Sequence, residues 1–178
     1  MIQGTTETTF KAYVCTEDNR IDTTAPTTKV RHLIKITNDM SGAIAYCYPA
    51  ETINNRYTEF TFTYALNPDM FLGEIDLKPA GYYKYEVYEV VWLGTVTVTD
   101  STAPATETDV LAVDPNNGIV KGLVTKGKWY QSDKAGTAQV QYTQHPEPTA
   151  SNYIWYGDSG FENAFSLDFD GVDDYVDC

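Results

Sequence analysis

Residues 83–87 read Tyr83-Lys84-Tyr85-Glu86-Val87, so that large side chains with apolar bodies alternate with charged ones. A period of two is typical of a β-strand that has one face against a core and the other in water. Tyr and Val also favour the pleated surface of a sheet. The stretch therefore predicts a half-buried strand, and similar patterns occur through the first ninety residues.

Four further apolar runs, each bounded by turn residues, indicate additional strands. Between two of them, Asn38 to Gly42 is typical of a hairpin connection, because Gly42 is free to adopt a positive φ. Several short strands separated by turns predict an all-β fold, and specifically an antiparallel, immunoglobulin-like β-sandwich over residues 1–93. The four runs are residues 10–14, 30–36, 43–48 and 60–64.

The pattern becomes sparser after Trp92. Residues 94–99 (GTVTVT) alternate and predict a short strand, whereas the polar, Pro-containing residues 100–109 predict an exposed loop or linker. Strands this widely spaced bury little core by themselves, so residues 94–160 are predicted to be an extended β-rich arm that pairs with another strand. Residues 161–178 form a third segment. Further isolated strands are expected at residues 123–130 and 138–142.

The charge distribution excludes some partners. The net charge is −13, and the 12 Lys and Arg are scattered rather than clustered. Phosphate binding needs a basic face, so no nucleic-acid role is expected, and the acidity also disfavours an anionic membrane surface. It would complement a basic patch on a protein partner. The opening MIQGTTETTF has no basic or apolar segment typical of a secretory signal, so synthesis and assembly in a cytoplasm are expected.

Residues suited to catalysis or metal binding are few. We expect no enzyme activity and no cofactor, because no nucleophile, phosphate-loop or metalloprotease motif is found. His32 lies on the apolar face of a predicted strand and is interpreted as structural. Cys15 and Cys47 are expected to be buried thiols, with a disulfide between them as the alternative. The acidic cluster Asp168–Asp177 is expected to be a solvated strand and turn, with a calcium site as the alternative.

Aromatic residues form the remaining candidate site. On an arm with little core, Trp and Tyr side chains are typical of anchors in a protein interface. Core packing and cross-strand aromatic pairs are the alternative, and a carbohydrate-stacking groove is a weaker one. The predicted interface residues are Trp129, Tyr130, Tyr142, Tyr153, Trp155 and Tyr156.

Two stretches resemble known families. Residues 166–177, SLDFDGVDDYVD, resemble the opening strand pair of a laminin-G-like, concanavalin-type jelly roll, which commonly reads FDGxDDYV. This resemblance implies the start of a lectin-like domain that would bind host surface glycans, with calcium as a candidate ligand. The 178 residues do not contain the rest of such a domain. We therefore expect that the chain is truncated or that its distal domain was left out.

Residues 80–89, AGYYKYEVYE, resemble a GxYxYxVYE pattern of structural proteins in tailed bacteriophages, especially those of Bacteroidetes-type and marine hosts. The runs 118–127, 140–143 and 152–157 are similar to segments that follow it in those proteins. The Thr-rich residues 99–109 depart from the pattern. The resemblance implies a head fibre, a decoration protein or the base of a tail fibre.

Together these patterns predict a virion structural protein, assembled in the host cytoplasm and docked on the capsid as a decoration or fibre-anchoring module. Its expected partners are the major capsid protein or other virion proteins and further copies of itself, for example in a trimer. The distal lectin-like domain would contact a host glycan. A tail-fibre or collar-associated protein is one alternative, and a carbohydrate-binding or adhesin module of a cell-surface protein is another.

Overall fold

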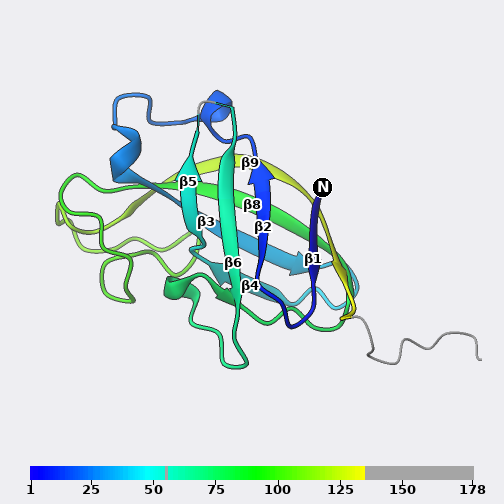
Figure 1. Cartoon of the computed structure of the whole chain (residues 1–178). Coiled ribbons are helices and arrows are strands. Elements are labelled where there is room, and N and C mark those ends of the chain that lie inside the picture. The colour runs from blue at the N-terminus through cyan, green and yellow to red at the C-terminus, as the bar shows by residue number, and fades with distance from the viewer. Residues whose placement is uncertain (55, 135–178) are drawn as a thin grey trace, which may run out of the picture. The chain divides into compact units, whose positions relative to one another are not determined.

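The computed structural model describes residues 1–54 and 56–134, and within this part the fold is all-β (Figure 1). Only three short 3₁₀ turns interrupt the strands and loops of the described residues: η1 (Glu17–Asn19), η2 (Thr27–Lys29) and η3 (Met70–Leu72). The strands are β1 (Ile2–Thr5), β2 (Phe10–Val14), β3 (Val30–Asn38), β4 (Ile44–Cys47), β5 (Ala50–Ile53), β6 (Thr58–Tyr64), β7 (Glu74–Ile75), β8 (Gly81–Val91) and β9 (Ile119–Ser132).

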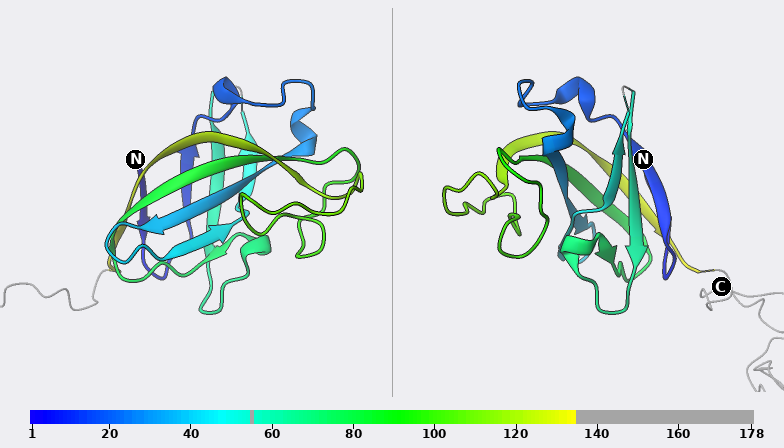
Figure 2. Two further views of the ribbon diagram at one scale, coloured as in Figure 1. Left: turned by 180° about the vertical axis from the view of Figure 1, so that it is seen from behind. Right: turned by 60° about the vertical axis from the view of Figure 1, so that its left-hand side comes forward.

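The strands form two sheets that pack face to face. One sheet has the order β1-β9-β8-β3-β4, and the other has the order β2-β6-β5 with the short β7 beside β6. Figure 2 shows the two sheets as separate layers whose strands cross. Most pairs are antiparallel, as predicted, but β1 pairs with β9 and β6 pairs with β7 in parallel. The prediction of a wholly antiparallel arrangement is therefore wrong at these two places.

The period-two pattern of residues 83–87 forms part of the core. Tyr83, Tyr85 and Val87 of β8 are buried, as expected, while Lys84 on the same strand points to water. They face Phe60 and Phe62 of β6 in the opposite sheet, so one cluster of side chains joins the two layers. Burying each large apolar side chain contributes about 1.5–3 kcal/mol, and this layer contact is therefore the main source of stability.

The position of strand β9 contradicts the prediction that residues 94–160 form an extended arm. The strand pairs with β8 along nearly the whole length of β8 and lies between β8 and β1, so residues 119–132 belong to the same sheet as β3 and β8. The described residues, 1–54 and 56–134, belong to one compact unit by their contacts. The boundary predicted after residue 93 is therefore wrong, because the buried face of β9 completes the core of the first ninety residues. Residues 135–178, with the rest of the predicted arm and the lectin-like start, lie outside the described residues.

The loop between β2 and β3 is fastened by a buried carboxylate. Glu89 of β8 is fully buried and accepts hydrogen bonds from the backbone N–H groups of Ile21 (3.1 Å) and Asp22 (2.9 Å). Asp22 also lies 3.2 Å from the ammonium of Lys121 on β9. Its pKa is held far below the usual range, first by the Thr24 hydroxyl and then by Lys121. These contacts hold the loop against β8 and β9.

His32 and the cysteines have the environments of structural residues, with one exception. His32 is buried, and its Nδ1 lies 2.7 Å from a carboxylate oxygen of Glu51, which links β3 of one sheet to β5 of the other. Cys47 is buried, and burial raises the pKa of its thiol. Cys15 is exposed just beyond the end of β2, so its predicted burial is wrong. Both thiols are free, which excludes the alternative disulfide between them in this structure.

Candidate functional site in the loop between β8 and β9

The loop between β8 and β9, residues 92–118, is the longest connection between strands in the described part of the chain. It contains no Lys or Arg. It contains four carboxylates, which makes it locally acidic: Asp100, Glu107, Asp109 and Asp114.

The first half of the loop packs on the outer face of the larger sheet. Trp92 and Ala103 are buried there with Leu33 and Val90, in a second apolar cluster separate from the core between the sheets. Val96 and Val98 pack against this cluster, although the strand predicted at residues 94–99 does not form. The alternation of these residues therefore reflects one buried side of an irregular segment.

Polar contacts fix the middle of the loop to the same face. Glu107 accepts hydrogen bonds from the ammonium of Lys35 on β3 and from the hydroxyl of Tyr46 on β4. Burial opposes ionisation of Glu107, but these two donors outweigh it and lower the pKa of the carboxyl. The hydroxyl of Tyr48 donates to the carbonyl of Pro104 at 2.7 Å. The loop is thus held to two different strands of the sheet.

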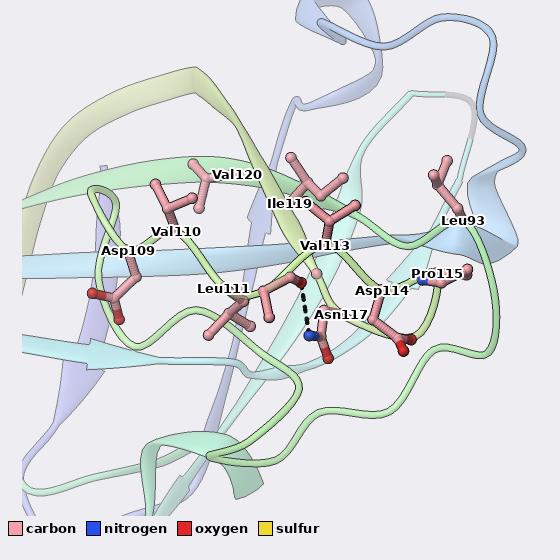
Figure 3. Close-up of a pocket in the computed structure, with 12 residues that line it drawn as sticks. Leu93, Asp109, Val110, Leu111, Val113, Asp114, Pro115, Asn117, Ile119 and Val120 are labelled. Atoms are coloured by element: carbon pink, nitrogen blue, oxygen red, sulfur yellow. Dashed lines mark hydrogen bonds between the residues drawn. The ribbon is translucent and has the colours of Figure 1, made fainter.

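The second half of the loop is closed by its own side chains. Asp109 accepts hydrogen bonds from the backbone N–H groups of residues 105 and 106 at 2.8 and 3.2 Å. The amide of Asn117 donates to the carbonyl of Ala112 at 2.9 Å (Figure 3). The amide oxygen of Asn116 accepts from the N–H of Thr95 at 3.0 Å, which ties the end of the loop to its beginning.

This closed segment surrounds an apolar cavity of about 320 Å³. Val110 is 94 % exposed, Val113 is fully exposed and Leu93 is 70 % exposed at its edge (Figure 3). The volume is at the low end of the ~300–1,000 Å³ of small-molecule sites, and it suits one or two side chains of a protein partner. Apolar side chains gathered in water around a hollow are typical of a binding surface.

The structure places two of the predicted interface residues. Trp129 lies on β9 but is completely buried, with its Nε1 donating to Oε1 of Gln131 at 2.9 Å, so it is a core residue and cannot contact a partner directly. Tyr130, next to it, is half-buried on the opposite face, where its ring centroid lies 5.0 Å from that of Tyr82. Neither lines the cavity. Tyr142, Tyr153, Trp155 and Tyr156 lie outside the described residues.

The cavity was missed in the sequence, although a signal was present. The apolar quartet from Val110 to Val113 stands between Asp109 and Asp114, within residues 94–160 that were predicted to be an extended arm. Four apolar residues beside turn-forming ones favour either a short buried strand or an exposed patch. The sequence alone does not decide between them.

Within residues 1–54 and 56–134, no group of three or more His, Cys, Asp or Glu side chains is placed to hold a metal ion. The acidic cluster from Asp168 to Asp177 lies outside this part. None of the helical segments described is long and apolar enough to cross a membrane.

Comparison with known proteins gives no relative: no family model, no curated protein and no solved structure matches the chain.

Proposed function

We propose that this chain is a structural attachment module of a tailed-bacteriophage virion and that it binds a partner protein through the loop of residues 92–118. The resemblance of residues 80–89 to phage structural proteins supports the virion, and the apolar cavity supports the binding loop. In this proposal the chain docks on the capsid as a decoration or fibre-anchoring module and acts by association rather than catalysis. Residues 161–178 would begin a lectin-like, host-binding domain.

We further propose that the fold is a variable-type immunoglobulin-like sandwich. The parallel pair of β1 with β9 and the orders β1-β9-β8-β3-β4 and β2-β6-β5 support this. Near the start of β8, the hydroxyl of Tyr83 donates to the carbonyl of Pro79 at 2.6 Å, which resembles the tyrosine corner of such domains. In a sandwich of this type, the loop between β8 and β9 is one of those that commonly bind partners.

The observation that carries the proposal is the exposure of Val110 and Val113 on a loop that is otherwise firmly held. An ordered loop loses little conformational entropy when it binds, so the burial of its apolar side chains contributes more fully to affinity. A few side chains that become fully buried account for most of the binding energy in protein interfaces.

The test is co-sedimentation of the purified chain with heads and with tails separated from tailed-phage particles. Val113→Asp places a charge at the edge of the cavity and is expected to abolish binding. Met40→Asp is the matched control, because Met40 is 94 % exposed in the distant β3–β4 hairpin. Equal binding by both variants, or no binding of the unaltered chain to any virion part or to itself, would refute the proposal. Light scattering of the free chain measures the expected homo-oligomer.

A carbohydrate-binding or adhesin module of a cell-surface protein is the second candidate. The exposed Tyr82 beside Tyr130 on the outer face of the sheet favours it, because paired aromatic rings offer a surface on which sugars stack. A glycan array is the test. Binding that is lost in Tyr82→Ala and retained in Val113→Asp would favour this candidate over the virion protein.

A further inference from the structure

Strand β9 is paired unequally on its two sides. On one side it pairs with β8 from Ile119 to Gln131, and on the other side β1 covers only Trp129–Ser132. Among the described residues, no strand lies beside the remaining part of this second side, from Ile119 to Lys128. The larger sheet therefore has a free edge within its longest strand, and the first two residues of this edge, Ile119 and Val120, also line the cavity.

A free edge presents unpaired backbone N–H and C=O groups that another strand is able to pair with. Side chains near this edge have apolar surface in water: Ile119 is 45 % exposed and Leu123 is 40 % exposed. Ile21, from the loop fastened by Glu89, is 46 % exposed, and its Cδ1 would lie 2.9 Å from a Cβ on Gly122. An added strand would pair the backbone groups and cover apolar surface at the same time.

The charges along the edge determine which kind of added strand would pair with it favourably. The free part of β9 contains Lys121, Lys126 and Lys128 and no carboxylate. Lys121 lies 3.2 Å from Asp22, and Lys128 lies 2.6 Å from Asp39. Lys126 has no ion-pair partner among the described residues. Like charges on neighbouring strands are destabilising and opposite charges are stabilising, so the edge disfavours a second copy of β9 and favours an acidic strand.

We propose that the free edge of β9, from Ile119 to Lys128, is a strand-addition site that takes an extended peptide segment in which Asp or Glu alternates with apolar residues. The acidic side chains of that segment lie on the same face as Lys126 and Lys128. Its backbone continues the sheet, and its apolar side chains lie on the opposite face, where they cover Ile119 and Ile21. This site goes beyond the proposed binding loop, since its strand pairing uses β9 and no residue of 92–118.

The test uses a synthetic peptide of about ten residues, the length of a long strand, that alternates Asp with Val. Binding to the full chain is measured by calorimetry, and amide hydrogen exchange is followed in residues 119–128, where new protection is expected. Two further peptides carry N-methyl groups, one on odd and one on even residues. Because a strand pairs through one edge only, one methylated peptide is expected to lose binding and the other to keep it. Equal affinities of the two methylated peptides, or no binding of the parent peptide, would overturn the proposal.

Charge-reversal variants test the selection by lysine. Lys126→Glu is expected to weaken binding of the Asp peptide by about threefold to tenfold, since it turns a cross-strand attraction into a repulsion. The same variant is expected to gain affinity for a peptide that alternates Lys with Val. Lys11→Glu on β2 is the matched control, because Lys11 is an exposed lysine of the other sheet. Equal affinity of both variants for the Asp peptide would contradict a site on β9, and unchanged binding in Val113→Asp separates this site from the proposed loop.

Discussion

Replacing Trp129 distinguishes a core residue from an interface anchor. Its indole ring is fully buried between the sheets, with its centroid 4.9 Å from the ring of Phe62 and 5.4 Å from that of Phe10. Truncating a buried aromatic residue to Ala costs about 3–5 kcal/mol through lost burial and the cavity left behind. Gln131 is also buried and would lose the donor to its Oε1, which costs about 1–3 kcal/mol more.

The expected loss for Trp129→Ala is therefore about 4–8 kcal/mol, which is comparable to the whole unfolding free energy of a marginal domain. Trp129→Phe keeps most of the apolar volume and leaves Gln131 without its donor, so a smaller loss of about 2–3 kcal/mol is expected. Urea unfolding followed by circular dichroism gives the free energy of unfolding for each variant.

Tyr130→Ala is the control from the neighbouring position on the other face of β9. It removes a half-buried ring that pairs with Tyr82, so a loss of about 0.5–1.5 kcal/mol is expected. If Trp129→Phe and Tyr130→Ala were equally stable, or if Trp129→Ala unfolded at the same urea concentration as the unaltered chain, the placement of Trp129 in the core would be refuted.

Three further predictions concern the loops. Gly118→Ala is expected to lower the thermal midpoint, because its Cβ would lie 2.6 Å from the ring of Trp92 and such overpacking costs about 1–3 kcal/mol; an unchanged midpoint would contradict the close contact. Glu89→Gln replaces one acceptor oxygen with a donor opposite backbone N–H groups, so faster hydrogen exchange at Ile21 is expected, and exchange at the original rate would show that the carboxylate does not hold the loop. The pKa of the Glu107 carboxyl is lowered in the folded state, so its ionised form stabilises the fold above the unfolded pKa, and this contribution is lost as the pH falls through the folded pKa. Between about pH 7 and pH 3, the urea midpoint of Glu107→Gln should therefore fall less steeply than that of the unaltered chain. Parallel curves for the two proteins would argue against the contact of Glu107 with Lys35.

The strands of the first ninety residues were predictable because their two faces meet different environments. Phe60 and Phe62 alternate with polar residues, and β2 begins and ends at the residues that the pattern indicated. The all-β class follows from such local alternation alone. The short β1 and β5 were not predicted, since a four-residue edge strand has too few alternating positions to stand out.

The place of strand β9 in the sheet and the formation of the cavity depend on contacts between distant residues, which a local sequence pattern does not show. The sequence indicates strands near residues 123–130, but only the pairing of Val91 with Ile119 across the long loop makes them part of the same sheet. Similarly, the quartet from Val110 to Val113 is apolar in any context. Its exposure follows from the contacts that hold the loop closed, such as Asn117 to Ala112, which join residues that are not adjacent in sequence.

The way in which the loop of residues 92–118 joins the sandwich has a consequence for evolution. Its two ends leave and enter neighbouring strands at the pair Val91 and Ile119, so the sheet itself holds the ends together. The entropy of closing a loop grows only slowly with its length, by about 0.6 kcal/mol for each doubling. Insertions and deletions within residues 109–117 would therefore change the shape of the cavity at little expense to the sandwich, and a lineage could adapt this surface to new partners while the sheets stayed as they are.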